Sequence, residues 1–267
     1  VNALRNILET LPAGEATMAT LNRLNRIGSF TTDTPTGTAD LVAVTTDLDA
    51  MLAAVDTTAD PRLGGITGIL ESWAGLQVDR NDDGFYDNPA GAIWNAWWQA
   101  MSDRVFADDT VGLIDRFVIA NLNHRLLAGD DAALPLINDY LEGETVSQAV
   151  TGALIAAIDE LTATYASADP QDWDQPISTI EWSPLGAGTV PDTIWMNRGT
   201  YNQIVHLGAD DTLRARNVVA PGQSGDAFSP HFSDQLELYA TLTYKEMLLT
   251  ERQVMNQAES VITLVVP

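Results

Sequence analysis

Apolar residues recur every three or four positions through the first two thirds of the chain, which places them on one face of an α-helix. The segments with this pattern are 4–11, 18–27, 41–55, 70–73, 89–106, 111–127, 134–141 and 145–166. Asp40 is expected to cap the third helix. Pro89 is expected to open the fifth, because proline in a first turn removes a donor that would have no partner there. The pattern therefore predicts a helical region over residues 1–168.

The pattern changes from residue 169 onwards. Four prolines and two glycines interrupt any helix over roughly 25 residues. Extended apolar runs then predict strands at 203–207, 213–219 and 261–266. Strands this short are not stable as an isolated pair, so they are expected to join other strands, including strands that this chain does not contain. The predicted fold class is α+β, with residues 169–267 as the strand-containing region.

One helical segment carries a wide aromatic stripe. Ile93, Trp94, Trp97, Trp98 and Met101 follow one another at helical spacing. Such a stripe is typical of a protein core rather than of a platform for sugars or nucleobases. We therefore expect these side chains to be buried.

The chain is strongly acidic. It contains 13 Lys and Arg residues against 37 Asp and Glu residues, a formal net charge of -24. Such a surface repels nucleic acids and anionic membranes, so neither is expected as a partner. No apolar run approaches the roughly 20 residues of a membrane-spanning helix. The absence of cysteine excludes disulfides and catalytic thiolates.

The sharpest local motif is the acidic loop at residues 79–90. Oxygen-bearing groups recur at alternate positions, as in a calcium-binding loop: Asp79, Asn81, Asp83, the carbonyl of Phe85, and Asp87. Gly84 stands at the sixth position, where such a loop turns sharply. The twelfth position is Ala90 instead of a bidentate glutamate, so one ligand would come from elsewhere. The motif predicts a structural Ca²⁺ site; the alternative is an acidic turn in which Asp87 caps the next helix.

Ser224, His231 and Asp234 carry the residue types of a catalytic triad. Ser224 stands in Gly-Gln-Ser-Gly, which is not a nucleophile-elbow motif, and Pro230 interrupts the helix that would follow an elbow. A serine in a turn more commonly satisfies backbone groups, and we favour that interpretation.

His206 lies within a predicted strand, on the same face as Ile204. A single histidine there is more commonly a packed residue than a base. His124 is expected at a surface position near a helix end, where a positive charge is favoured. The nearby carboxyl groups of Asp172, Asp174 and Glu181 do not establish paired-carboxylate chemistry, which requires groups that face each other.

Several strings together resemble the penicillin acylase family of N-terminal-nucleophile amide hydrolases. The strings are NPAGAIWNAWW after the acidic loop, NRGT at 197–200, VVAPGQSG at 218–225, and SPH at 229–231 followed by DQ at 234–235. They are similar in order to the C-terminal part of the family's large subunit, and span about Asp79 to Glu251 of this chain. The resemblance implies that the two late strands belong to the αββα layered core of an Ntn hydrolase.

In this family the nucleophile is the first serine of the large subunit, with its own α-amine as base. Since this chain begins with Val1, the resemblance implies that the catalytic centre lies in an upstream part of the same precursor, which also supplies a small subunit. The expected substrates of the parent are small N-acylated compounds such as β-lactams or acyl-homoserine lactones, and the expected location is periplasmic or extracellular. His206 falls where related acylases carry a glutamate that supports a catalytic histidine, which makes it a candidate supporting residue.

The chain alone is expected to be inactive, and its uncovered strands are expected to allow self-association. The alternative to the hydrolase interpretation is a non-catalytic module, stabilised by calcium, that serves assembly or binding.

Overall fold

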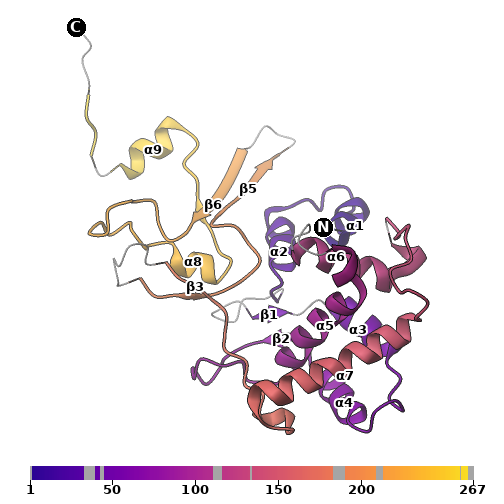
Figure 1. The fold of residues 1–267 in the computed structure, drawn as a ribbon. Helices are drawn as coiled ribbons and strands as arrows, with labels where there is room; N and C mark the ends of the chain where they lie inside the picture. Colours follow the sequence, from indigo (N-terminus) through magenta and orange to yellow (C-terminus); the bar gives the residue numbers. More distant parts are fainter. Residues whose placement is uncertain are drawn as a thin grey trace. The chain divides into compact units, whose positions relative to one another are not determined.

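The computed structural model describes residues 2–32, 40–42, 45–110, 116–132, 134–182, 190–208, 213–258 and 260–263. They form two compact units (Figure 1). One unit comprises residues 40–177, and the other comprises residues 1–39 together with 178–267. These units are defined by proximity in space, whereas the predicted boundary at residue 168 divides helices from strands. That boundary stays a prediction.

The 40–177 unit is helical. Its elements are α3 (Thr45–Ala54), α4 (Leu63–Ser72), α5 (Ala90–Thr110), α6 (Arg116–Ala128), α7 (Val146–Tyr165), the 3-10 turns η1 (Gly129–Asp131) and η2 (Pro170–Asp172), and the strands β1 (Leu41–Val42) and β2 (Leu76–Gln77). α7 starts with a capping box, in which Thr145 and Gln148 each bind the other's backbone amide. α5 and α7 form the most extensive helix pair of the unit, and the buried residues of α7 include the small side chains of Ala149, Ala153 and Ala157.

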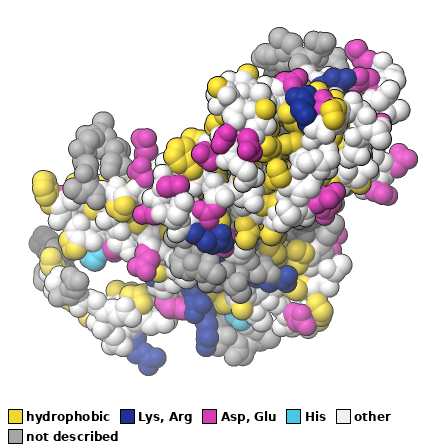
Figure 2. Space-filling model, turned by 90° about the horizontal axis from the view of Figure 1, so that it is seen from below, with side chains coloured by type: hydrophobic (Ala, Val, Ile, Leu, Met, Phe, Trp, Pro, Cys, Tyr) yellow, Lys and Arg dark blue, Asp and Glu magenta, His cyan; other side chains and the backbone are white. Residues whose placement is uncertain are grey.

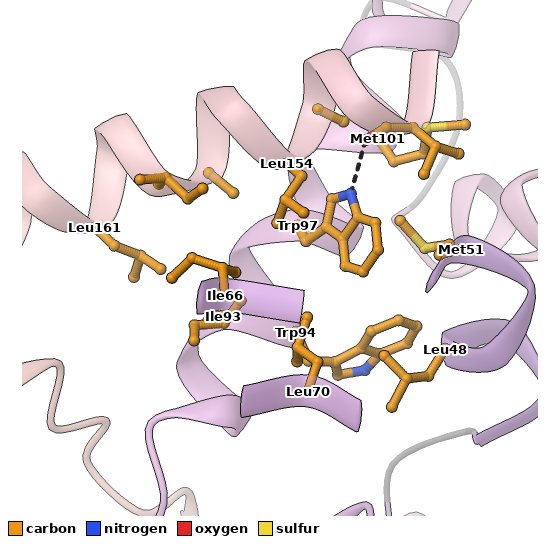
Figure 3. Close-up of a cluster of buried hydrophobic side chains, with 14 of the residues drawn as sticks. Leu48, Met51, Ile66, Leu70, Ile93, Trp94, Trp97, Met101, Leu154 and Leu161 are labelled. Carbon is orange, nitrogen blue, oxygen red and sulfur yellow. Dashed lines mark hydrogen bonds between the residues drawn. The ribbon is translucent and has the colours of Figure 1, made fainter. Parts of the chain in front are cut away.

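The aromatic stripe lies in the core of this unit, as predicted (Figure 3). Ile93, Trp97 and Met101 have no exposed surface and Trp94 is 7% exposed, whereas Trp98 is only partly buried, packed against the same core. The indole N–H of Trp97 donates to the Val150 carbonyl of α7 at 2.9 Å, so the one polar atom of this ring is satisfied. Trp97 therefore adds a hydrogen bond to the apolar packing between α5 and α7.

The second unit combines helices with small antiparallel sheets. Its elements are α1 (Asn2–Thr10), α2 (Met18–Gly28), β3 (Thr179–Ile180), β4 (Thr193–Ile194), β5 (Tyr201–Leu207), β6 (Leu213–Val219), α8 (Leu236–Ala240), β7 (Lys245–Glu246) and α9 (Glu251–Gln257). β3 pairs with β4, and a second sheet has the order β5-β6-β7. α2 packs on β5.

β5 and β6 confirm the two strands predicted from the sequence. They pair along their whole length, from Tyr201 opposite Val219 to Leu207 opposite Leu213. The alternation along β5 also follows the prediction: Ile204 is buried and His206, on the same face, is half-buried, whereas Val205 and Leu207 are exposed. Among the described residues β5 has a strand neighbour on one side only, so its other edge is open.

Three predicted elements differ in the structure: the helix at 41–55, the strand at 261–266 and the helix at 134–141. Residues 41–42 form strand β1 and not the start of a helix, which begins at Thr45. Asp40 is consequently no cap, and its carboxylate lies 3.6 Å from the Arg80 guanidinium. Residues 260–263 are not in a strand, and 264–266 lie outside the described residues.

The helix predicted at 134–141 is also wrong. Arg125 donates from its guanidinium to the carbonyls of Leu134 and Pro135, so these oxygens are bound by a side chain and not by a helical amide. Leu134 and Ile137 are 72% and 94% exposed, whereas Leu136, Tyr140 and Leu141 pack against the core, so the buried positions do not follow helical spacing. A helix this short is not stable unless one of its faces is buried.

Acidic side chains are scattered over the face seen in Figure 2 and form no single dense patch there. This distribution agrees with the excess of carboxylates in the sequence. None of the described helices combines the length and the apolar character of a bilayer-spanning segment.

Candidate functional site

The 220–235 loop follows β6 and contains the serine, histidine and aspartate weighed above. Gln235 closes it: its backbone N–H donates to the Pro221 carbonyl at 3.1 Å, and its side-chain oxygen accepts the Val219 N–H at 3.0 Å. The Ser224 N–H donates to the His231 carbonyl at 3.1 Å, so both halves of the loop are joined through the backbone.

Within this loop the structure brings together two of the three candidate residues. His231 Nδ1 and Asp234 Oδ2 are 2.9 Å apart. The Ser224 hydroxyl oxygen instead accepts the Asp226 N–H at 3.1 Å. Among the described residues, that hydroxyl makes no hydrogen bond to the imidazole. Since the histidine and aspartate side chains are 58% and 38% exposed, this is a solvated pair on a turn, and the serine is not activated by a base.

The acidic loop lies between β2 and α5 and is built from side chain to backbone hydrogen bonds. Asp79 accepts the N–H groups of Asp83 and Gly84 at 3.2 and 2.9 Å, and Asp83 accepts the Phe85 N–H at 2.9 Å. Asn81 donates to Asp83 Oδ2 at 2.8 Å. The turn at Gly84 has φ +87°, a conformation that favours glycine. The oxygens of Asp79, Asn81 and Asp83 are thus gathered around one tight turn.

The end of this loop departs from the calcium pattern. Asp87 accepts the Arg80 N–H at 3.1 Å and lies 3.5 Å from its guanidinium, so its charge already has a partner. Ala90 is buried in the first turn of α5 and offers no ligand. The oxygen that accepts from this helix start belongs to Asn88, which accepts the Ala90 N–H at 2.8 Å, and not to Asp87.

The described residues contain no group of three or more His, Cys, Asp or Glu side chains placed to hold a metal ion. The acidic loop nevertheless fits a hard cation through a different donor set. It offers the carboxylates of Asp79 and Asp83, the amide oxygen of Asn81, and the Phe85 carbonyl. Ca²⁺ accepts such mixed oxygen ligands and completes its coordination with water.

The other histidines have separate surroundings. His206 lies on β5 opposite Arg214 of β6. His124 is not a simple surface residue: its Nδ1 lies 2.6 Å from Oδ1 of Asp47, a buried carboxylate on α3. This contact joins α6 to α3. It could not be predicted from the sequence because the partners are separated by 77 positions.

A cavity of about 520 Å³ lies in the 40–177 unit, with Ile66, Ile69, Ile158 and Trp173 among its lining residues. The cation on its lining, Arg62, is bound by Asp60 and Asp159, each at 2.7 Å. The hydrogen bonds from Arg62 lower the pKa of Asp60 to about 2. Because this guanidinium is neutralised by its neighbours, it offers a ligand no unpaired charge.

Arg198 is a candidate that no sequence pattern singled out; it entered only as part of the 197–200 string. Its guanidinium carbon lies 4.6 Å from the ring centroid of Tyr239, and Nη1 donates to the Tyr239 carbonyl at 2.9 Å. Burial lowers the pKa of Arg198, since desolvation penalises the charged form; nearby Arg26 acts in the same direction. The sequence feature that could have pointed to this residue is an arginine between Asn197 and Gly199, just before strand β5.

The sequence model of the family described as penicillin amidase matches residues 5–256. The chain belongs to the penicillin amidase family. A curated relative, penicillin G acylase from Escherichia coli, is 24% identical over 241 residues, which cover 76% of this chain and 28% of the relative. A solved structure, the thermostable penicillin G acylase from Alcaligenes faecalis in orthorhombic form, matches with a TM-score of 0.61 at 18% identity. That match covers 94% of this chain and 50% of the other.

Two conclusions follow for this member of the penicillin amidase family. The predicted α+β class and its Ntn-hydrolase assignment are confirmed, because the chain shares the fold of a penicillin acylase over nearly its whole length. The chain also spans half the length of that solved chain and 28% of the Escherichia coli relative. The roles predicted for His206 and for the acidic loop stay predictions.

Proposed function

We propose that this chain is the C-terminal part of the large subunit of a penicillin-amidase-type hydrolase that cleaves amide bonds. The observation that carries the proposal is the family match over residues 5–256, combined with the limited share of each relative that the chain covers. The nucleophilic serine, its α-amine and the acyl pocket belong to the part of the precursor outside these 267 residues. The substrates are small N-acylated compounds, with β-lactams and acyl-homoserine lactones as the two classes to test.

In this proposal the chain's role is to complete a sheet and to support the catalytic part. One observation in favour is the open edge of β5 among the described residues. A second is an apolar strip on the face opposite Ile204, where Tyr201, Val205, Leu207 and Leu213 are 45–78% exposed. Apolar side chains at an open strand edge favour pairing with another strand. The upstream part of the same precursor is the proposed occupant, and self-association is the expected behaviour when that part is absent. The proposed location is the periplasm or the extracellular space.

The activity test compares the 267-residue chain with a longer protein that includes the upstream part. The longer protein is expected to hydrolyse phenylacetyl or fatty-acyl amides, and the shorter chain to show background rates only, because the nucleophile lies outside it. A longer protein with its N-terminal serine replaced by alanine is the control. Hydrolysis by the short chain alone, or an inactive longer protein, would contradict the proposal. An inactive longer protein that still binds calcium would favour the non-catalytic module.

We also propose that the acidic loop binds Ca²⁺ through Asp79, Asn81, Asp83 and the Phe85 carbonyl. Asp87, which pairs with Arg80, acts as a support for the loop and not as a direct ligand. Support comes from the two carboxylates and one amide oxygen gathered around the Gly84 turn. The loop is also fixed on both sides, since Tyr86 donates to the Gln175 carbonyl and Asp87 to the Val78 carbonyl.

Calcium is expected to raise the melting temperature of the chain by about 5–10 °C relative to EDTA when its concentration is about 100 times the dissociation constant. The variant Asp83→Ala is expected to lose this shift. Asp82→Asn is the matched control, since it removes one charge from the same loop at a position outside the alternating set and keeps a residue that tolerates φ +60°. Equal calcium responses in wild type and Asp83→Ala would end the metal proposal.

A further inference from the structure

Two arginines lie at the carbonyl end of α8. Arg26, which is 3% exposed, donates from Nη2 to the carbonyls of Thr241 and Leu242 at 2.9 and 3.3 Å. Arg198 donates from Nη1 to the carbonyl of Tyr239, and the Tyr239 hydroxyl donates back to the Arg198 carbonyl at 3.4 Å. The Arg198 guanidinium is therefore fixed at its Nη1 end and stacked against a ring at 4.6 Å.

The other side of the same guanidinium has no acceptor. Nε and Nη2 of Arg198 are both shielded from solvent, and neither has a hydrogen-bond partner in the structure described here. These two nitrogens form the edge of the guanidinium whose N–H bonds run parallel, the edge that binds both oxygens of a carboxylate at once. A buried donor without an acceptor is costly, and a charged donor more so.

The two parallel N–H donors of Nε and Nη2 indicate which kind of acceptor would bind here. A backbone carbonyl or a water molecule would satisfy one N–H well, whereas a carboxylate satisfies both and also neutralises the charge. A negative group would also offset the repulsion between the positive charges of Arg198 and nearby Arg26. Arg198 as a whole is only half-buried, and its neighbours Asn197 and Gly199 are exposed. The edge therefore lies next to exposed residues of the chain.

We propose that the Nε/Nη2 edge of Arg198 is a carboxylate-binding site. The carboxylate comes either from an Asp or Glu side chain in the upstream part of the precursor or from a free small carboxylate. The first source rests on the proposed function; the second does not. In the 267-residue chain the guanidinium of this site is already oriented by the Tyr239 ring and by its hydrogen bond to the Tyr239 carbonyl.

The test follows the Arg198 Nε–H resonance by NMR, assigned through its proximity to the Tyr239 ring, so that it needs no variant. Sodium acetate is added to the 267-residue chain at fixed pH and ionic strength, with sodium chloride as the reference salt. The resonance is expected to move downfield, with half-saturation on the order of 10–100 mM for one bidentate pair in partly exposed surroundings. Any acetate-dependent shift of the neighbouring Gly199 backbone amide, which can be followed in both proteins, is expected to be absent in Arg198→Lys, which keeps the charge and lacks the edge. Arg216→Lys, at an exposed arginine paired with Glu246, is expected to leave it unchanged.

The longer protein separates the two sources. If its Arg198 Nε–H is already downfield and insensitive to acetate, the carboxylate is a side chain of the upstream part. If both proteins respond to acetate, the site takes a free carboxylate. No acetate-specific shift in either protein, with the resonance at the position of an unbonded Nε–H, overturns the proposal. Amide hydrolysis by the longer protein tests the proposed function separately, so one can fail while the other stands.

Discussion

Replacing Trp97 with alanine is expected to lower the free energy of unfolding of the 40–177 unit by about 3–5 kcal/mol, the usual cost of removing a fully buried large aromatic side chain. Trp97 has no exposed surface and lies between α5 and α7 (Figure 3). The buried cluster that contains Trp97 also includes small residues of α7 such as Ala153, which cannot extend to fill a cavity. The substitution also removes the donor that binds the Val150 carbonyl.

Urea denaturation followed by near-ultraviolet circular dichroism measures this loss as a lower midpoint at an unchanged m-value. Trp97→Phe is the informative intermediate: it keeps most of the apolar volume and loses the hydrogen bond, so a smaller cost of about 1–2 kcal/mol is expected. Ile137→Ala, at a side chain that is 94% exposed in the same unit, is the control and should change the stability by less than about 0.5 kcal/mol. If Trp97→Ala were as mild as this control, the packing of α5 on α7 would be wrong.

The features that the sequence predicted well are those set by local periodicity. The stripe on α5 and the strands β5 and β6 all depend on side chains that alternate within one element, and their spacing is visible in the sequence. The same reasoning failed at 134–141, where Leu134 and Ile137 are exposed and Leu136 and Tyr140 pack against the core instead. Periodicity shows which face could pack, and only the tertiary structure shows whether a partner exists.

The features that the sequence did not predict are contacts between distant residues. Asp40 was expected to cap a helix and instead lies near Arg80. His124 is partly exposed near a helix end, as expected, and its contact with Asp47 was not predicted. The Nε/Nη2 edge of Arg198 lacks a partner in a site formed with Tyr239 of α8, 41 positions away, and the sequence does not show that the two residues meet. The acidic loop could be proposed as a metal site from spacing alone, because its alternating oxygen-bearing residues are contained in nine consecutive positions, 79–87, and its metal stays a prediction. Sites formed within one loop are readable in a sequence, and sites formed between elements are not.

Replacing Gly222 with alanine is expected to destabilise the second unit by about 3 kcal/mol, the upper end of the usual cost of overpacking. A Cβ atom at this position would lie 2.2 Å from the His231 carbonyl oxygen and 2.6 Å from that of Phe232. Both are backbone atoms and cannot rotate away as a side chain could. The 220–235 loop must therefore open, which breaks the Ser224 to His231 backbone hydrogen bond and displaces the buried Gln235.

Gly225→Ala, three positions along the same loop, provides the matched control. No heavy atom lies within 4 Å of the Cβ that it would add, so a change within about 0.5 kcal/mol is expected. Denaturation measures both variants, and hydrogen exchange at the amides of Ser224 and Gln235 shows whether the loss is local to the loop. Faster exchange at both amides in Gly222→Ala, with native rates in Gly225→Ala, is the expected pattern. Similar stabilities in the two variants would mean that His231 and Phe232 do not close over Gly222. The hydrogen bond from the Ser224 N–H to the His231 carbonyl, which fixes Ser224 in its turn, would then be wrong as well.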